Sequence, residues 1–278
     1  MSTIVITGGT DGIGRYLTNF YIARGDRVVV IGRNPTQGEA IENAGGTFLR
    51  VDLDSIEENY AAIDKINTSY PAIDALVFCA RFYRSDRTET VDGIESTFAH
   101  FYLSRYLFGH HLAETLERST SPVIVNVAGP GAPLEAANFD DLQLVGNYSG
   151  GAALGQGGKL NDLLGVSFAE RHPGSAIRYA LVHPGVTATA QRGQYDAATS
   201  IMVEQMRRSA KPIALAADPI IELIGNPPAE ALSAFVEGRR VGVGDRGFDP
   251  GAARALDAYT QNLLDHNRTR PARVADEK

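Results

Sequence analysis

Short, almost wholly apolar runs recur along the first two thirds of the chain, and longer amphipathic segments separate them. The runs cover residues 3–7, 27–31, 47–51, 75–79, 123–128 and 176–182. Each has the length of a strand that is buried on both faces of a sheet. Helical patterns lie between them, at residues 12–24, 55–69, 91–118 and 159–171. This alternation predicts an α/β fold with a doubly wound parallel sheet and helices on both faces.

The alternation breaks after His183. Residues 187–210 are polar and irregular. We expect them to form a substrate lid, because an insertion after the sixth strand lies where a doubly wound sheet opens towards its ligand. Two later runs, at residues 234–236 and 241–243, are expected to extend the sheet edge. No repeat and no Pro-, Gly- or Ser-rich linker divides the sequence, so residues 1–278 are predicted to form one domain.

The composition argues against several classes of function. The formal net charge is -7, which disfavours nucleic acid as a partner because phosphate binding needs a basic surface. The single cysteine, Cys79, excludes a multi-cysteine metal site, and the histidines lack companions at metal-ligand spacing, so no metal is expected. No apolar stretch approaches the ~20 residues of a membrane span, and no signal peptide is recognised. We therefore expect a cytoplasmic protein with a small-molecule partner and no membrane contact.

A glycine-rich loop follows the first predicted strand and leads into the first predicted helix. Gly8 permits a tight turn, Gly12 lets the backbone approach a pyrophosphate, and Gly14 allows close packing of helix on strand. The helix N-terminus favours an anion through its free N–H groups and its dipole. The loop predicts a dinucleotide site on a Rossmann-type sheet, formed by Gly8, Thr10, Asp11, Gly12, Ile13 and Gly14.

The end of the second predicted strand indicates which dinucleotide is bound. An NAD site places a carboxylate there to accept from the ribose 2′-hydroxyl. Here Gly32 is followed by Arg33 and Asn34. A guanidinium suits a 2′-phosphate because its rigid fork pairs with phosphate oxygens, and Arg15 adds a second positive charge nearby. The predicted cofactor is therefore NADP(H).

These motifs together resemble the short-chain dehydrogenase/reductase family over most of the chain. The loop has the spacing Thr-Gly-x-x-x-Gly-x-Gly, and matching segments follow in the family's order: Asp52-Leu53, Asp92-Gly93-Ile94-Glu95, Val125-Asn126-Val127, Lys159-Leu160-Asn161 and His183-Pro184-Gly185-Val186 with Thr189. The resemblance implies that Asp52 and Leu53 hold the adenine. It implies that Pro184, Gly185, Val186 and Thr189 hold the nicotinamide end and the pyrophosphate. Ala80 and Arg81 would lie beside the nicotinamide ribose, and Lys159 would bind that ribose.

The family's acid–base residues are missing. The resemblance places the catalytic tyrosine at Gly155, the carbonyl-polarising serine at Gly129 and the water-ordering asparagine at Phe101. Glycine has no donor, so neither position can protonate an alkoxide. Lys159 is a match by position only. The resemblance therefore implies that the cofactor-binding half of the family's site remains and that its proton-donating half is lost.

Other residues could supply the missing proton. Tyr148 precedes Gly155 in a glycine-rich segment, Tyr195 lies in the lid and His183 precedes the Pro-Gly loop. A structural role is favoured for each of them. Arg81 stands where the family has glycine, and two readings stay open: contact with a phosphate or an acidic or phenolic substrate, or an arginine that extends from a strand end into solvent.

Three functions remain open. The favoured one is an atypical NADPH-dependent ketoreductase in which a phenolic hydroxyl beside the substrate carbonyl supplies the proton. Replacement of tyrosine and serine by glycine would widen the pocket for a flat polycyclic aromatic ketone. This pattern resembles the divergent reductases that tailor aromatic polyketides, including the simocyclinone-type (angucyclinone) ketoreductases of antibiotic biosynthesis. The alternatives are a non-redox cyclase or isomerase on the same fold and a catalytically silent NADP(H)-binding regulatory protein. Homo-oligomer formation is also left open.

Overall fold

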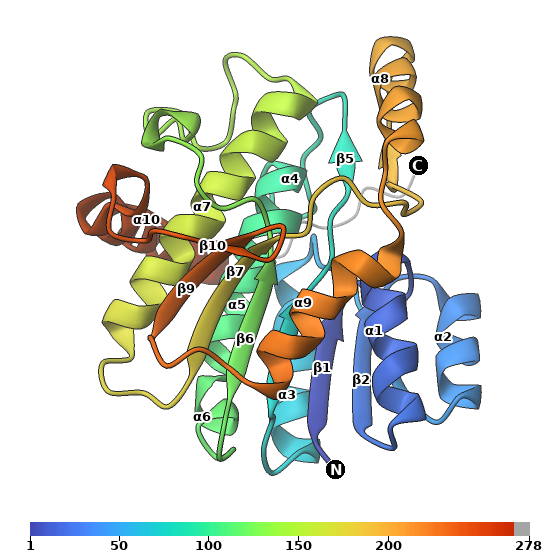
Figure 1. Cartoon of the computed structure of the whole chain (residues 1–278). Coiled ribbons are helices and arrows are strands. Elements are labelled where there is room, and N and C mark those ends of the chain that lie inside the picture. Colours follow the sequence, from blue (N-terminus) through green and yellow to red (C-terminus); the bar gives the residue numbers. More distant parts are fainter. Residues whose placement is uncertain (270–278) are drawn as a thin grey trace.

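One large sheet organises the molecule (Figure 1). The computed structural model describes residues 1–269, and its eight-stranded sheet has the order β10–β9–β7–β6–β4–β1–β2–β3. All neighbouring pairs are parallel except β10 with β9. The strands are β1 (Thr3–Thr7), β2 (Arg27–Gly32), β3 (Thr47–Arg50), β4 (Ala75–Phe78), β6 (Val123–Val127), β7 (Arg178–His183), β9 (Leu232–Val236) and β10 (Arg239–Val241). The predicted α/β class and mostly parallel sheet are confirmed.

Helices cover both faces of this sheet. Successive residues of a strand point to opposite faces, so Ile4 and Ile6 of β1 join one core and Val5 joins the other. One face is covered by α1 (Gly12–Ala23) and α9 (Ile213–Gly225), which pack against each other. The second core is formed with α3 (Ile56–Ser69), α5 (Ser104–His111), α7 (Gly150–Arg171) and α10 (Pro250–Thr269). The fold is therefore doubly wound.

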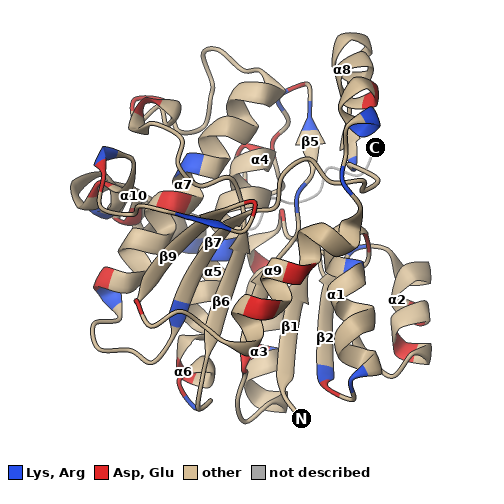
Figure 2. Cartoon of the chain, in the orientation of Figure 1, with Lys and Arg blue, Asp and Glu red and all other residues tan. Residues whose placement is uncertain are grey.

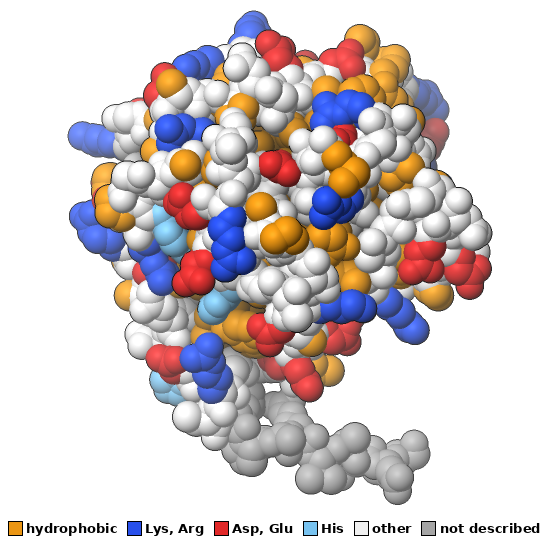
Figure 3. Space-filling view, turned by 90° about the horizontal axis from the view of Figure 1, so that it is seen from below, with side chains coloured by type: hydrophobic (Ala, Val, Ile, Leu, Met, Phe, Trp, Pro, Cys, Tyr) orange, Lys and Arg blue, Asp and Glu red, His pale blue; other side chains and the backbone are white. Residues whose placement is uncertain are grey.

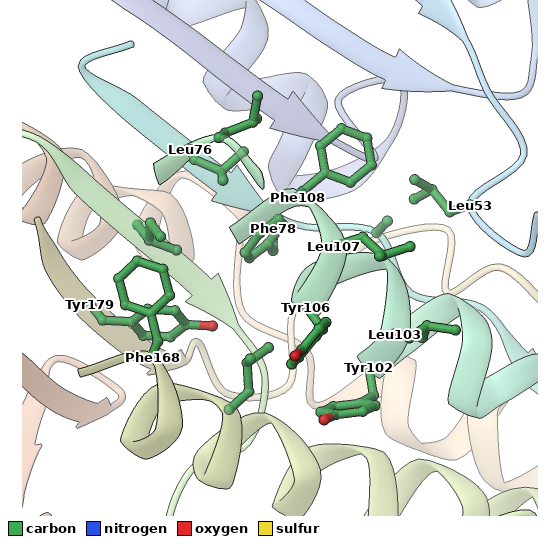
Figure 4. Close-up of a cluster of buried hydrophobic side chains, with 14 of the residues drawn as sticks. Leu53, Leu76, Phe78, Tyr102, Leu103, Tyr106, Leu107, Phe108, Phe168 and Tyr179 are labelled. Atoms are coloured by element: carbon green, nitrogen blue, oxygen red, sulfur yellow. The ribbon is translucent and has the colours of Figure 1, made fainter. Parts of the chain in front are cut away.

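Aromatic side chains fill the second core (Figure 4). Phe168 of α7 packs on Tyr179 of β7, with ring centroids 5.3 Å apart. Tyr102 and Tyr106 come from the helical segment across from them. Burial of such rings adds to the apolar stabilisation of this face.

The segment at residues 91–118 is not the single helix that its pattern predicts. It contains α4 (Ser96–Phe98), the π-helix η1 (Ala99–Leu103), α5 and α6 (Ala113–Leu116). The helix begins late because Gly93, at a φ of 75°, closes a turn. The carboxylate of Glu95 then accepts hydrogen bonds from the N–H groups of Thr97 and Phe98 and caps the first turn.

Helix α7 begins at Gly150, nine residues before the predicted start at Lys159. Ser149 caps it by accepting a hydrogen bond from the Ala152 N–H at 3.2 Å. Glycines inside the helix lowered its apparent propensity, but one of them is needed for packing. A Cβ at Gly157 would lie 2.6 Å from Cδ1 of Phe101. Close packing of α7 against η1 therefore outweighs the propensity.

The predicted lid, residues 187–210, contains β8 (Gly193–Gln194) and α8 (Ala197–Arg208). β8 pairs with β5 (Tyr83–Arg84) in a separate two-stranded sheet. α8 buries none of its residues and projects beyond the end of the main sheet (Figure 1). The remaining elements are α2 (Pro35–Asn43) and the 3-10 turns η2 (Leu134–Ala136) and η3 (Arg246–Phe248).

The surface carries charges of both signs. Figure 3 views the end of the molecule where the parallel strands begin, and basic and acidic side chains are interspersed on it. At the opposite end, Lys and Arg positions gather on β5 and at the base of α8 (Figure 2). No helix within residues 1–269 is long and apolar enough to cross a membrane.

Candidate functional site

The carboxyl ends of β1, β2, β4, β6 and β7 open into one cavity of about 640 Å³. Parallel strands end at the same edge of a sheet, which is where this class of fold binds ligands. Most of the predicted site residues line the cavity: Gly8, Thr10, Asp11, Gly12, Ile13, Gly14, Arg33, Leu53, Ala80, Arg81, Gly129, Gly155, Pro184, Gly185, Val186 and Thr189. Asn34, Asp52 and Lys159 do not.

The glycine loop has the geometry that a dinucleotide needs. Gly8 has a φ of 70°, and a Cβ there would lie 2.7 Å from the Ala80 backbone. A Cβ at Gly14 would lie 2.3 Å from the Gly8 carbonyl oxygen. The first helical bond of α1 runs from the Arg15 N–H to the Asp11 carbonyl, at 3.0 Å. The N–H groups before it point out of the helix end, so the loop fits a pyrophosphate.

Arg33 lies at the adenine end of the cavity. Its guanidinium is 3.6 Å from the Asp52 carboxylate, and both side chains are partly exposed. It also stacks over the Phe82 ring at 5.4 Å. Asn34 instead caps α2 by accepting from the Gln37 N–H at 3.2 Å. Arg15 donates to Asn19 and does not line the cavity, so Arg33 alone of the two predicted arginines reaches it.

A buried network near this end was not predicted from the sequence. The Nδ1 atom of His100 lies 2.7 Å from the Asp54 carboxylate, and Arg84 lies 2.5 Å from the same group. Burial would raise the pKa of Asp54, but the His100 hydrogen bond and the Arg84 charge hold that pKa below its usual value. His100 itself lines the cavity. Asp54 and His100 are 46 residues apart, and no sequence motif joins them.

Arg105 is a second unpredicted residue, and it lies beneath the cavity. Its guanidinium donates to the carbonyls of Ala80, at 2.8 Å, and Val127, at 3.0 Å, and to the Asn126 side chain. Burial lowers the pKa of Arg105 to about 10. These bonds tie the end of β6 to the segment that follows β4. Arg105 therefore positions the floor of the cavity.

Lys159 lies away from the cavity. Its side chain is fully buried, and Nζ donates to the Asp162 carboxylate at 2.7 Å and to the Gly247 carbonyl at 2.8 Å. Burial raises the pKa of Asp162 to about 6, against the opposing effect of the Lys159 charge. In this structure, Lys159 therefore does not occupy the ribose-binding position that the family resemblance implies. Here it joins α7 to η3.

The two positions that lack the family's acid–base residues face open space. A Cβ at Gly155 would meet no atom within 4 Å, and one at Gly129 would meet only Cδ2 of His183, at 3.6 Å. Both residues line the cavity. Both positions therefore leave open the part of the cavity that a side chain would occupy.

The alternative proton donors are engaged elsewhere. Tyr148 donates to the Arg84 carbonyl at 3.1 Å, and Tyr195 donates to the Gln191 carbonyl at 2.5 Å. Neither of them lines the cavity. His183 does line it, and its Nδ1 accepts from the Gly185 N–H at 3.3 Å. Burial, together with nearby cations, lowers the pKa of His183, so its imidazole is held in the neutral form.

Part of the predicted lid contacts the glycine loop. Arg192 forms an ion pair with Asp11 at 2.7 Å, and both line the cavity. A Cβ at Gly12 would lie 2.8 Å from the Thr189 side chain. The ring of Tyr195 stacks on Tyr83, with centroids 5.1 Å apart. From this segment, the residues that line the cavity are Thr187, Thr189, Ala190, Gln191, Arg192 and Met206.

The part of the chain that the structure describes offers no metal-binding group. No three or more His, Cys, Asp or Glu side chains come together in residues 1–269 in a way that could hold a metal ion. The Cys79 thiol lines the cavity, and burial raises its pKa to about 12. It is therefore protonated at neutral pH and is a weak nucleophile.

Part of the chain matches a known family, and several curated proteins are similar to it over about two thirds of its length or more. Residues 2–139 match the family described as short chain dehydrogenase. Retinol dehydrogenase 12 from Mus musculus is 26% identical over 191 residues, which cover 66% of this chain and 60% of that protein. A Streptomyces sp. (strain C5) protein named as a daunorubicin C-13 ketoreductase, DnrU, is 27% identical over 236 residues, covering 82% of this chain and 79% of that one. The chain spans about 60% of the length of the first curated relatives it matches.

Solved structures share the fold at low identity. A protein of uncharacterised function from Mycobacterium Paratuberculosis superimposes with a TM-score of 0.67 at 21% identity, covering 95% of this chain and 94% of that one. A short chain dehydrogenase from Shigella flexneri, complexed with NADP, gives a TM-score of 0.64 at 17% identity, covering 86% of this chain and 97% of that one. These likenesses establish the mostly parallel sheet flanked by helices.

Proposed function

Taking the chain as a member of the short-chain dehydrogenase/reductase superfamily, which its match over residues 2–139 supports, we propose that it is an NADPH-dependent ketoreductase. Its substrate is a polycyclic aromatic ketone with a phenolic hydroxyl beside the carbonyl. The observation that carries this proposal is the pair Gly129 and Gly155. Both open onto the cavity that also contains the glycine loop and Arg33.

The residues at the cofactor end support NADPH. The glycine loop presents its helix N-terminus to a pyrophosphate, and Arg33 offers a guanidinium to a 2′-phosphate. When bound, NADPH would donate a hydride to the carbonyl carbon, and the cofactor would thereby become NADP⁺. The NADP complexes among the structural neighbours support this cofactor in relatives of the same fold.

The proton must come from outside the family's usual donors. Among the described residues that line the cavity, hydroxyl groups come only from Thr10, Thr187 and Thr189, on the glycine loop and the lid segment that faces it. We assign the proton on the product oxygen to the neighbouring phenol of the substrate, which regains a proton from water. The cavity walls orient the ring system, and proximity then lowers the barrier.

The name of the Streptomyces relative supports carbonyl reduction as the reaction class. A non-redox cyclase and a silent NADP(H)-binding regulator are the alternative functions. In a reductase the nicotinamide end of the cavity must be accessible to substrate. The open space at Gly155 meets that requirement, whereas a regulator that only binds the dinucleotide does not need it.

Matched substrates test the proposal. We would incubate the protein with NADPH and a peri-hydroxy aromatic ketone, and in parallel with the methyl ether of that hydroxyl, and follow the absorbance of the reduced nicotinamide. Oxidation of NADPH with the phenol and a loss of about 10²- to 10⁴-fold with the ether is expected, because general acid catalysis commonly contributes that factor. Equal rates with the two substrates would refute the substrate-derived proton. Tight NADPH binding without any oxidation would favour the regulator, and product formation without NADPH consumption would favour the isomerase.

A further inference from the structure

Three arginines line the cavity, and two of them already have carboxylate partners. Arg33 lies 3.6 Å from Asp52, and Arg192 lies 2.7 Å from Asp11. Arg81 differs from both. Within residues 1–269, no hydrogen bond or ion pair joins its guanidinium to another residue. Arg81 is exposed and lines the cavity, so its guanidinium is available to an anion that enters from solvent.

The cavity does not contain that anion. Among the described lining residues, Asp11 is the only acidic side chain, and Arg192 already pairs with it. The lining is therefore positive in a chain whose formal net charge is -7. Such a local field draws anionic ligands into a cleft whatever the total charge.

The position of Arg81 separates it from the two phosphate-binding regions. Arg33 serves the adenine end, beside Leu53, and Arg192 lies over the glycine loop. Arg81 follows β4, and the charges that it influences belong to the Tyr195 phenol and the His183 imidazole. His183 in turn lies against Gly129, where a Cβ would be 3.6 Å from its ring. Arg81 is therefore placed at the reacting end of the cavity.

We propose that Arg81 binds an ionised oxygen on the aromatic substrate, a carboxylate or a phenolate other than the phenol that donates the proton, and thereby selects anionic over neutral aromatic ketones. Only the ketone group of this ligand rests on the proposed function. The anion site itself depends on the free guanidinium and the positive lining.

The chemistry of the side chain fits this role. An arginine guanidinium stays charged at neutral pH, and its planar fork can donate two parallel hydrogen bonds to one carboxylate. Arg81 is exposed to the cavity, so a ligand can reach it without a rearrangement of the chain. A phenolate would accept from the same fork through one oxygen. Both sources share the chemistry of an oxyanion attached to a flat ring.

Binding of redox-inert probes tests the proposal without turnover. Calorimetric titration of the NADP⁺-loaded protein would compare 2-naphthoate with neutral 2-naphthamide, and 4-nitrophenolate with neutral 4-nitroanisole. We expect at least one anion to bind more tightly than its neutral match, and the two pairs identify which oxyanion is preferred. Arg81→Met should weaken that anion by about tenfold or more and leave the neutral probe nearly unchanged, because hydrogen bonds to charged groups are worth about 1.5–3 kcal/mol. Arg81→Lys should restore part of the loss.

Arg208→Met is the matched control. Arg208 is an exposed residue at the end of α8 and does not line the cavity, so its replacement removes one positive charge nearby and should leave both kinds of probe unaffected. Far-UV circular dichroism verifies that each variant is folded. Equal affinity of anionic and neutral probes for the wild-type protein would overturn the proposal. So would an Arg81→Met variant that loses NADP⁺ affinity and keeps the anion.

Failure of the proposed function has a different signature. The same titrations are run on the chain without NADP⁺. If no ketone is reduced, or if NADP⁺ does not bind, but the anion preference still depends on Arg81, the reductase proposal fails and the anion site stands. If NADPH reduces neutral and anionic ketones equally well in the wild type and in Arg81→Met, the reductase stands and the anion site fails.

Discussion

Replacing Lys159 with methionine distinguishes the structural role seen here from the ribose-binding role implied by the family pattern. Both side chains of the Lys159–Asp162 pair are fully buried, with Nζ 2.7 Å from the carboxylate and 2.8 Å from the Gly247 carbonyl. Methionine fills similar space but leaves a buried carboxylate without its partner. Removal of one member of a buried ion pair typically costs about 3–5 kcal/mol. We expect the free energy of unfolding at pH 8 to fall by about that amount.

The double variant Lys159→Met/Asp162→Leu is the control. Replacement of a whole buried pair by apolar side chains is often neutral or stabilising, so the double variant should recover most of the loss. The single variant should also recover in part near pH 5, because the Asp162 carboxyl, whose pKa burial raises to about 6, is then neutral. The chain contains no tryptophan, so unfolding in urea is followed by far-UV circular dichroism.

Affinity for NADPH is measured on the same samples. If Lys159 only joins α7 to η3, the folded Lys159→Met protein binds NADPH as the wild type does. A variant with wild-type stability and much weaker NADPH binding would refute this reasoning. It would show that the lysine faces the ribose when the cofactor is bound.

Three further predictions concern single positions. Gly155→Ala should raise the free energy of unfolding by up to about 1 kcal/mol, because its Cβ meets no atom within 4 Å. Gly157→Ala should lower the free energy of unfolding by about 1–2 kcal/mol, because its Cβ would lie 2.6 Å from an aromatic carbon. Urea unfolding of the two variants checks these opposite signs. Arg33→Ala should reduce the preference for NADPH over NADH by roughly tenfold or more, as measured by fluorescence titration, and Arg15→Ala, outside the cavity, should not change it. Asp162→Asn should change the pH dependence of the free energy of unfolding. Burial raises the pKa of Asp162 from 3.8 to about 6, so the stabilisation from protonating this carboxyl in the folded state is fully present below pH 3.8 and is lost as the pH rises through about 6. A pH profile of unfolding in which wild type and Asp162→Asn run parallel would contradict that last expectation.

Local patterns were sufficient to predict the sheet and the phosphate-binding end. The strand at residues 3–7 was predicted with its observed bounds, because five buried apolar or small residues leave little choice of structure. Gly8 and Gly14 were identified by spacing, and both are sterically required where they stand. The residues that line the cavity mostly follow strand ends, and strand ends are readable from hydrophobic runs.

The helices were harder to predict because their ends depend on distant contacts. Nothing within residues 91–118 marks the π turn at Ala99–Leu103. The start of α7 at Gly150 is favoured by packing against segments far away in sequence, and helix propensity alone opposes it. The Asp54–His100 pair and the bonds of Arg105 likewise join residues that no motif connects.

The sequence by itself determined that the chain forms a doubly wound sheet with a glycine loop, and that Gly129 and Gly155 carry no acid–base side chain. Only the tertiary structure decided where the charged side chains point. It turned Lys159 into a buried pair with Asp162, while it left Arg81 facing the cavity without a partner. The physical reason is that glycine spacing and hydrophobic runs act locally, whereas the partner of a charge is set by whichever groups the folded chain brings within a few ångströms.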